Sequence, residues 1–75
     1  MENVIIYTAD NCKFCEAAKQ VLIQKGVAYE ERNVYRSEQF LSEARELGNR
    51  WLPIIKAKDK VLVFPTMDEI YALLD

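Results

Sequence analysis

Cys12 and Cys15 are the two cysteines of the chain, and Lys13 and Phe14 stand between them. A strand-like run ends shortly before this motif and a helix-like run begins at it, so one helical turn would bring the two Cα atoms within disulfide distance. Unpaired N–H groups and the positive end of the helix dipole favour a thiolate at the first cysteine. A thiolate attacks a disulfide, and a second thiol one turn away can resolve the mixed disulfide. The spacing therefore predicts thiol–disulfide exchange.

The two sulfurs are expected to have different roles. Cys12 is the candidate nucleophile, because the helix terminus should lower the pKa of its thiol more than the flexible and screened side chain of Lys13 does. Cys15 lies one turn further into the helix, should be more buried, and is the candidate resolving thiol. The alternative is a pair of inert or structural thiols, and the position of the motif at a helix start argues against it.

Composition restricts the other functions that the chain could have. Seventy-five residues form one domain, residues 1–75, with 51% hydrophobic content, a net charge of −2 and an isoelectric point near 5.1. This charge offers nucleic acid no broad basic face, and no apolar run approaches the roughly 20 residues of a membrane span. The absence of histidine excludes Ser-His-Asp and Cys-His catalysis and imidazole zinc sites, so we expect no metal.

The start of the chain bears on the compartment. A strand-like run begins almost directly after Met1, and Glu2 is acidic, so we expect no secretory leader. Two cysteines in a reducing compartment indicate redox chemistry more than a structural disulfide. We therefore expect a cytoplasmic protein.

Periodicity and capping signals divide the chain into seven elements in the order β-α-β-α-β-β-α. The expected strands cover residues 4–8, 28–33, 51–55 and 61–63, and the expected helices cover 12–25, 37–47 and 66–74. The charged segment between the last two strands is short enough for a hairpin, so these strands should be antiparallel. A right-handed β-α-β unit followed by a hairpin and a helix predicts an α/β fold, with a four-stranded mixed sheet and helices on both faces.

Details of the helices follow from the same signals. Asp10 or Asn11 could cap the first helix, and Ser37 the second. Phe14, Ala18, Val21 and Leu22 share one face of the first helix, while Phe14 fits a substrate groove equally well. The third helix begins with a capping-box pattern, Thr66-Met67-Asp68-Glu69, and should bury Ile70, Tyr71 and Leu74.

On these features the chain resembles the glutaredoxin family, which has the thioredoxin fold in its smallest form. The resemblance rests on Ile6-Tyr7-Thr8 leading into the cysteine motif, on Leu52-Pro53-Ile54-Ile55, and on Asp68-Glu69-Ile70-Tyr71. It implies an enzyme that reduces protein disulfides. It also implies that Phe14, Leu52, Pro53 and Asp68 bind substrate. A cis Pro53 would expose the Leu52 backbone to a substrate strand, whereas the alternative is an ordinary trans proline.

Several positions depart from the pattern of glutaredoxins that use glutathione. Ala9 stands where these proteins usually have lysine, Lys13-Phe14 replaces the common Pro-Tyr, Trp51-Leu52 replaces Thr-Val, and Pro65-Thr66 replaces Gly-Gly. These changes weaken the features that hold glutathione, although Asp68 remains as a partner for its amino group. Glutathione is thus expected at most as a co-substrate, and no cofactor is expected to be bound.

The same departures resemble the NrdH-type redoxins, a sister group that takes electrons from thioredoxin reductase and reduces ribonucleotide reductase. These proteins carry Leu-Pro followed by two β-branched residues, as Leu52-Pro53-Ile54-Ile55 does, and Phe64-Pro65 is similar to the aromatic segment before their last helix. The resemblance implies a monomer that acts on a disulfide-containing protein such as ribonucleotide reductase, with thioredoxin reductase or glutathione as the electron donor.

A second functional class is a glutathione-ligated iron–sulfur carrier, which would use Cys12 from each of two monomers. The weakened glutathione features and the presence of Cys15 count against it.

Three further features have a structural and a functional interpretation. Trp51 is expected to pack rather than to dock a partner. Lys56, Lys58 and Lys60 are expected to form a solvated hairpin tip rather than a contact for an acidic partner. Asp68 is expected mainly to support the N-terminus of the last helix.

Overall fold

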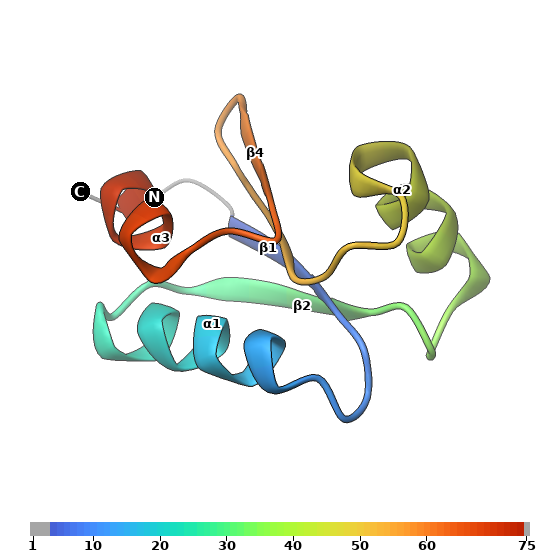
Figure 1. The fold of residues 1–75 in the computed structure, drawn as a ribbon, viewed down its shortest axis with the longest axis horizontal. Helices are drawn as coiled ribbons and strands as arrows, with labels where there is room; N and C mark the ends of the chain where they lie inside the picture. Colours follow the sequence, from blue (N-terminus) through green and yellow to red (C-terminus); the bar gives the residue numbers. More distant parts are fainter. Residues whose placement is uncertain (1–3, 75) are drawn as a thin grey trace.

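The computed structural model describes residues 4–74 and contains the seven elements in the expected order. The strands are β1 (Val4–Thr8), β2 (Tyr29–Asn33), β3 (Ile54–Ala57) and β4 (Lys60–Val63), and the helices are α1 (Lys13–Gln24), α2 (Glu38–Gly48) and α3 (Met67–Leu74) (Figure 1). None of these helices, within residues 4–74, is long and apolar enough to cross a membrane.

The four strands form one mixed sheet in the order β2-β1-β3-β4. β1 runs parallel to β2 and antiparallel to β3, and β3 and β4 form an antiparallel hairpin, as expected. In this register Tyr7 lies opposite Ile54, and Thr8 lies opposite Asn33. The ends of β1 and β2 and the start of β3 therefore meet at one edge of the sheet, and the cysteine motif follows β1 at this edge.

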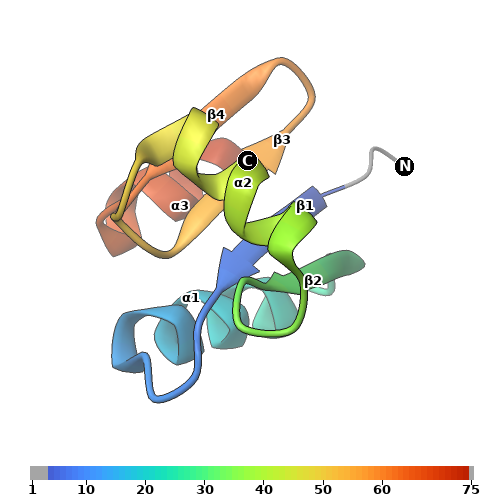
Figure 2. The same ribbon diagram turned by 90° about the vertical axis from the view of Figure 1, so that its right-hand side faces the viewer.

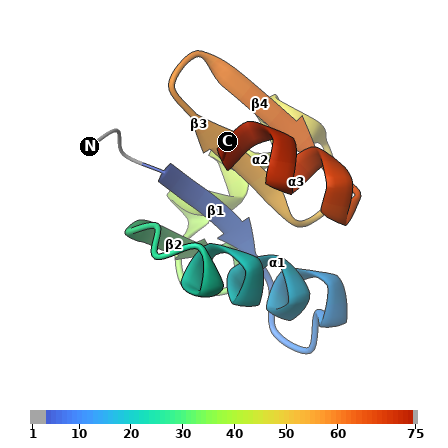
Figure 3. The same cartoon turned by 90° about the vertical axis from the view of Figure 1, so that its left-hand side faces the viewer.

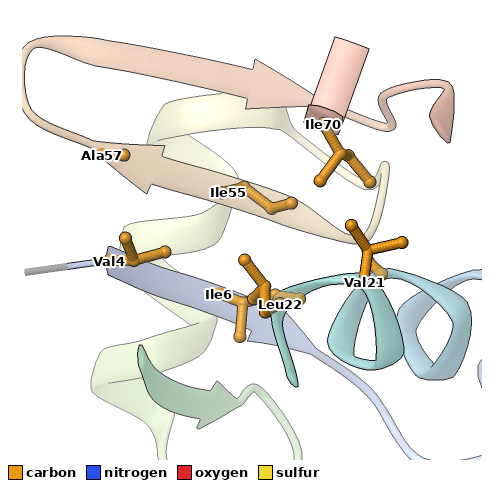
Figure 4. Close-up of a cluster of buried hydrophobic side chains, with 8 residues drawn as sticks. Val4, Ile6, Val21, Leu22, Ile55, Ala57 and Ile70 are labelled. Carbon is orange, nitrogen blue, oxygen red and sulfur yellow. The ribbon is translucent and has the colours of Figure 1, made fainter. Parts of the chain in front are cut away.

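Helices cover both faces of the sheet, which confirms the prediction. α1 and α3 lie together in front of the sheet in Figure 3, and α2 lies in front when the molecule is seen from the opposite side in Figure 2. The core under α1 and α3 contains Val4, Ile6, Ala18, Val21, Leu22, Ile55, Ala57 and Ile70 (Figure 4). The smaller core under α2 contains Tyr7, Val34, Ala44 and Ile54. The two cores hold the central strands from both sides.

Local signals at the helix ends agree with the sequence except at α1. The Ser37 hydroxyl caps α2 by accepting from the amides of Gln39 and Phe40. The capping box of α3 is complete, because Glu69 accepts from the Thr66 amide at 2.8 Å and the Thr66 hydroxyl accepts from the Glu69 amide at 3.2 Å. At α1, neither Asp10 nor Asn11 is the cap; the cap is described with the site below.

The two strands of the hairpin begin and end differently from the prediction. β3 begins at Ile54 rather than at residue 51, because the chain approaches the sheet through Pro53, which has no amide proton to give to a ladder. The hairpin turn is also shorter than predicted: it consists of Lys58, which has a φ of 60°, and Asp59. The lysine side chains at residues 56, 58 and 60 are exposed.

Phe14, which fits a helical core face and a substrate groove equally well, is exposed, and so is Tyr71, which was expected on the buried face of the last helix. Phe14 is 61% exposed, and the buried residue of the first turn of α1 is Cys15. Tyr71 is 38% exposed and packs under the ammonium group of Lys25, whose nitrogen lies 5.8 Å from the ring centroid. Ile70 alone fills the buried position of α3.

A polar network joins β1, β2 and α2. The Tyr7 hydroxyl donates to Glu43 at 2.9 Å, and the Arg32 guanidinium donates to Glu43 at 2.8 Å and to the Tyr7 oxygen at 3.2 Å. Burial raises the pKa of Tyr7, and the hydrogen bond from Tyr7 lowers the pKa of Glu43. The neutral phenol and the carboxylate thus fix α2 over the central strand.

Candidate active site

Cys12 is itself the N-cap of α1. Its backbone is extended, with φ −108° and ψ 104°, and its sulfur accepts from the amide of Cys15 at 3.1 Å. The expectation that Asp10 or Asn11 caps this helix is wrong, because Asn11 adopts a left-handed φ of 56° and turns the chain one residue later. The sulfur therefore lies where free amide groups and the helix dipole favour negative charge.

The two sulfurs are joined in a disulfide between Cys12 and Cys15, whose Cα atoms are 5.2 Å apart. Cys15 is fully buried, at 0% exposure, whereas Cys12 is half-buried. A shallow hollow of about 370 Å³, which Asn11, Lys13 and Glu16 line together with Cys12, opens at this sulfur. An incoming thiolate or disulfide can thus reach Cys12, and Cys15 is accessible only through it.

The edge of the sheet brings the residues around Pro53 beside this motif. The Leu52–Pro53 peptide bond is cis, in agreement with the resemblance. Pro53 is buried, and its carbonyl accepts from the Phe64 amide at 2.9 Å. On the other side the Thr8 carbonyl accepts from the Val34 amide at 2.9 Å. The first of these bonds extends the pairing of β3 with β4, and the second extends the pairing of β1 with β2.

Three aromatic side chains form an exposed patch at the site, which we call the aromatic patch: Phe14, Trp51 and Phe64. The Phe14 and Phe64 rings meet edge to face at 5.2 Å between centroids, and Trp51 lies 5.6 Å from Phe64. Phe14 and Trp51 are each 61% exposed, and Phe64 is 42% exposed. Trp51, which was expected to pack rather than to dock a partner, packs on Phe64 and is also largely exposed. Phe64 was missed as a site residue, although its place after β4, opposite Pro53, could have indicated it.

A charged cluster joins the end of β1 to β2 and α1. The buried hydroxyl of Thr8 donates to Glu31 at 2.7 Å, and the Lys19 ammonium bridges Glu31 at 3.2 Å and Glu16 at 2.9 Å. The hydrogen bond from Thr8 lowers the pKa of Glu31, and the hydrogen bond to Glu16 raises the pKa of Lys19. Two carboxylates thus neutralise Lys19, and the hydrogen-bond donor that the structure shows at the Cys12 sulfur is the Cys15 amide.

The other two predicted binding residues are Leu52 and Asp68, which lie on different segments. Leu52 is half-buried next to Pro53. Asp68 is exposed in the first turn of α3, where its charge favours the helix N-terminus, and the capping hydrogen bonds there come from Glu69 and Thr66. Within residues 4–74, no three His, Cys, Asp or Glu side chains form a group that could hold a metal ion.

Comparison with known proteins gives consistent results. The family model described as Glutaredoxin matches residues 4–62. The glutaredoxin-like protein NrdH of Lactococcus lactis subsp. lactis is 30% identical over 56 residues, which cover 75% of this chain and 78% of that protein. The residues matched by the family model include the cysteine motif and Pro53.

Solved structures have the same architecture. The glutaredoxin-like protein NrdH-redoxin from Escherichia coli, whose structure was related to a thioredoxin-like activity profile, superposes with a TM-score of 0.83 at 32% identity and covers 95% of this chain and 93% of its own. The glutaredoxin from Brucella melitensis has a TM-score of 0.73 at 31% identity and covers 97% of this chain and 78% of its own. The thioredoxin-like protein BC3987, as its T8A mutant, shares the fold with a TM-score of 0.88 at 20% identity, covering 96% and 99%.

Proposed function

Because the chain belongs to the glutaredoxin family and is a thiol–disulfide oxidoreductase, we propose that it reduces protein disulfides with Cys12 as the nucleophile and Cys15 as the resolving thiol. The observation that carries this assignment is the asymmetry of the pair. The sulfur of Cys12 is half-buried and caps α1, while Cys15 is fully buried behind it. A reducing compartment such as the cytoplasm would keep the pair cycling.

The proposed reaction balances over two exchange steps. The Cys12 thiolate attacks one sulfur of the substrate disulfide, which forms a mixed disulfide and releases the other substrate sulfur as a thiolate that takes up a proton. The Cys15 thiol then loses its proton and attacks the Cys12 sulfur, which closes the intramolecular disulfide and releases the second substrate thiol. The substrate gains two electrons from the chain and two protons, of which one is released by Cys15 and one comes from solvent, because Cys12 enters the reaction as a thiolate.

We further propose thioredoxin reductase as the electron donor. The aromatic patch beside Cys12 offers a surface for a protein partner, whereas Ala9 lacks the ammonium group that would hold a glutathione carboxylate. The thioredoxin-like activity profile named for the Escherichia coli NrdH-redoxin supports the same donor. By the same resemblance, ribonucleotide reductase is the first protein substrate to test.

A serine series tests the roles of the two cysteines. Cys12→Ser should abolish disulfide reduction, whereas Cys15→Ser should accumulate a mixed disulfide between Cys12 and the substrate that mass spectrometry detects. Full activity of Cys12→Ser would overturn the assignment. Turnover is then measured with NADPH and either thioredoxin reductase or glutathione with its reductase, and sustained turnover only with the glutathione pair would refute the donor.

The iron–sulfur carrier needs Cys12 as an open thiolate ligand. The disulfide of Cys12 with Cys15 supports dithiol chemistry instead. A brown protein with charge-transfer absorbance after anaerobic purification would favour the carrier, and a colourless protein that turns over would favour the reductase.

A further inference from the structure

A pocket of about 310 Å³ opens on the α2 face at the sheet edge where the site lies. Its apolar lining comes from Ala9, Val34 and Leu52, which we call the floor, and from Leu41 and Ala44 of α2. The register explains this floor. Tyr7 pairs with Ile54 and Thr8 with Asn33, so Ala9, Leu52 and Val34 are the residues that continue β1, β3 and β2 past the sheet. Figure 1 shows the segment between α2 and β3 returning to the sheet near the end of β1.

The rim of this pocket is positively charged. Arg45, in the last turn of α2, and Arg50, just after the helix, both line the pocket and are exposed. Within residues 4–74 neither guanidinium takes part in an ion pair, although Arg32 and Lys19 are both paired with carboxylates. Asn49 turns the chain between the two arginines with a φ of 61°. The apolar floor therefore lies beside two arginines that have no carboxylate partner among the residues the structure describes.

Tyr35, which also lines the pocket, is held through its backbone amide. The Asn33 side-chain oxygen accepts from the Tyr35 amide at 2.8 Å, and its amide group donates to Asp10 at 2.9 Å. Tyr35 itself is 68% exposed above the pocket. Because Asp10 lies in the loop that leads to Cys12, the same residue, Asn33, fixes both Tyr35 at the pocket and the approach to the nucleophile.

We propose that this pocket is a specificity site for the polypeptide substrate. It takes a large apolar side chain on the floor of Ala9, Val34 and Leu52, and a neighbouring substrate carboxylate pairs with Arg45 and Arg50. This inference rests on the proposed function. It defines the substrate class as polypeptide segments in which an apolar residue and an acidic residue lie next to the disulfide. An extended segment that runs along Leu52 places its disulfide towards Cys12 and its apolar residue in the pocket.

The volume and the charge both favour this occupant. A cavity of about 300 Å³ lies at the lower end of the range for small-molecule sites and holds a leucine or phenylalanine side chain. Arginine binds carboxylates in a bidentate geometry. Arg45 and Arg50 should therefore favour a substrate in which the residue next to the apolar side chain is acidic rather than basic.

The test uses peptides that contain a Cys-x-x-Cys disulfide followed by Leu-Glu, Leu-Lys or Gly-Glu. Single-turnover reduction by the reduced protein gives kcat/KM for each peptide, divided by the rate of the same protein on a small neutral disulfide. We expect Leu-Glu to be reduced about tenfold faster than Leu-Lys or Gly-Glu. The double variant Arg45→Gln/Arg50→Gln should lose about fivefold on Leu-Glu and less than about twofold on Leu-Lys.

Lys58→Gln/Lys60→Gln is the matched control, because it removes the same charge at the exposed hairpin tip far along the sheet from the pocket. Through long-range electrostatics alone it should lower the rate on Leu-Glu and raise the rate on Leu-Lys, each by less than about twofold. Equal rates for all three wild-type peptides, or an equal loss on Leu-Glu and Leu-Lys in the arginine variant, would overturn the specificity site.

A binding measurement separates this inference from the proposed function. A cysteine-free Leu-Glu peptide is added to the oxidised protein, and the amide resonances of Ala9, Val34 and Leu52 are followed by NMR. Their shift on titration supports the pocket even if no disulfide is reduced, and unchanged resonances refute it even if reduction proceeds. Failure to reduce the small neutral disulfide would refute the proposed function alone.

Discussion

The amide of Cys15 donates to the sulfur of Cys12 at 3.1 Å, so the proposed resolving cysteine also supplies a backbone hydrogen bond to the proposed nucleophile. This bond belongs to the first turn of α1, because Cys12 is the N-cap. The amide does not depend on the side chain of Cys15. Opening the disulfide therefore leaves a donor aimed at the sulfur that must carry the negative charge.

This relationship predicts that the pKa of the Cys12 thiol in the reduced protein lies below the ordinary thiol range. The measurement is the rate of iodoacetamide alkylation against pH, and the same chain in denaturant is the reference. Cys15→Ser should keep the lowered midpoint, because the amide donor remains. A midpoint in the folded variant equal to that of the denatured chain would contradict the role of the helix terminus.

The aromatic patch predicts an effect on partner binding. Phe64 contacts both Phe14 and Trp51, so Phe64→Ala removes the centre of the patch. We expect the KM for the proposed reductase to rise roughly tenfold, because buried aromatic anchors dominate protein interfaces. Ile23→Ala, which removes a 54% exposed side chain on α1 outside the patch, is the control and should leave KM unchanged. Equal effects of the two variants would remove the patch from the interface.

Trp51 gives an optical test of the same surface, because it is the one tryptophan of the chain. Binding of the reductase should cover its indole ring and shift its emission to shorter wavelength. The shift should weaken in Phe64→Ala, because the tilted ring contact at 5.6 Å that orients the indole is lost. Quenching that is unrelated to reductase concentration would count against docking at this residue.

The hydrogen bond between Thr8 and Glu31 predicts a pH-dependent stability. Because the pKa of Glu31 is lowered in the folded protein, the ionised carboxylate adds to the free energy of unfolding. This contribution is fully present above the pKa that Glu31 has in the unfolded chain. It is lost as the pH falls through the lower pKa of the folded state. Thr8→Val should cost about 1 kcal/mol at pH 7 and little at pH 2. Urea unfolding at the two pH values checks this, and an equal loss at both would show that packing rather than the hydrogen bond is responsible.

The close surroundings of Gly48 predict that a side chain at this position destabilises the protein. A Cβ at this position would lie 2.8 Å from a Val63 methyl and 2.9 Å from Ile54 Cδ1. Alanine normally stabilises a helix relative to glycine. Here the clash with Val63 and Ile54 should make Gly48→Ala destabilising, with a loss of about 1–2 kcal/mol in the free energy of unfolding. Val63→Ala should recover part of this loss in a double-mutant cycle of unfolding free energies. Additive effects would place the strain elsewhere.

The order of elements and the two cysteines could be predicted because each depends on short-range rules. The capping box at Thr66 and the spacing of the cysteine motif are local signals, and the structure contains both. The cis state of Pro53 came from the family resemblance rather than from any local rule. Local signals were thus sufficient to predict the order of the elements and the two cysteines of the site.

The surroundings of the sulfurs could not be predicted from spacing. Helical periodicity assigns Phe14 to the buried face, but no element covers the first turn of α1 there, and Cys15 is buried instead. Trp51 and Phe64 come from segments on either side of the hairpin, and only the register of β3 with β4 brings them together. The convergence of Arg45 and Arg50 on one pocket likewise depends on the turn at Asn49.

The burial of Cys15 has a consequence for oxidative damage. A peroxide that enters from solvent meets the Cys12 sulfur first, because Cys15 has no exposed surface. Sulfenic acid formed at Cys12 is then next to a thiol that condenses with it, and the product is the same disulfide that the catalytic cycle makes. Peroxide thus returns the protein to a state that its reductant already recycles, before sulfinic acid can form.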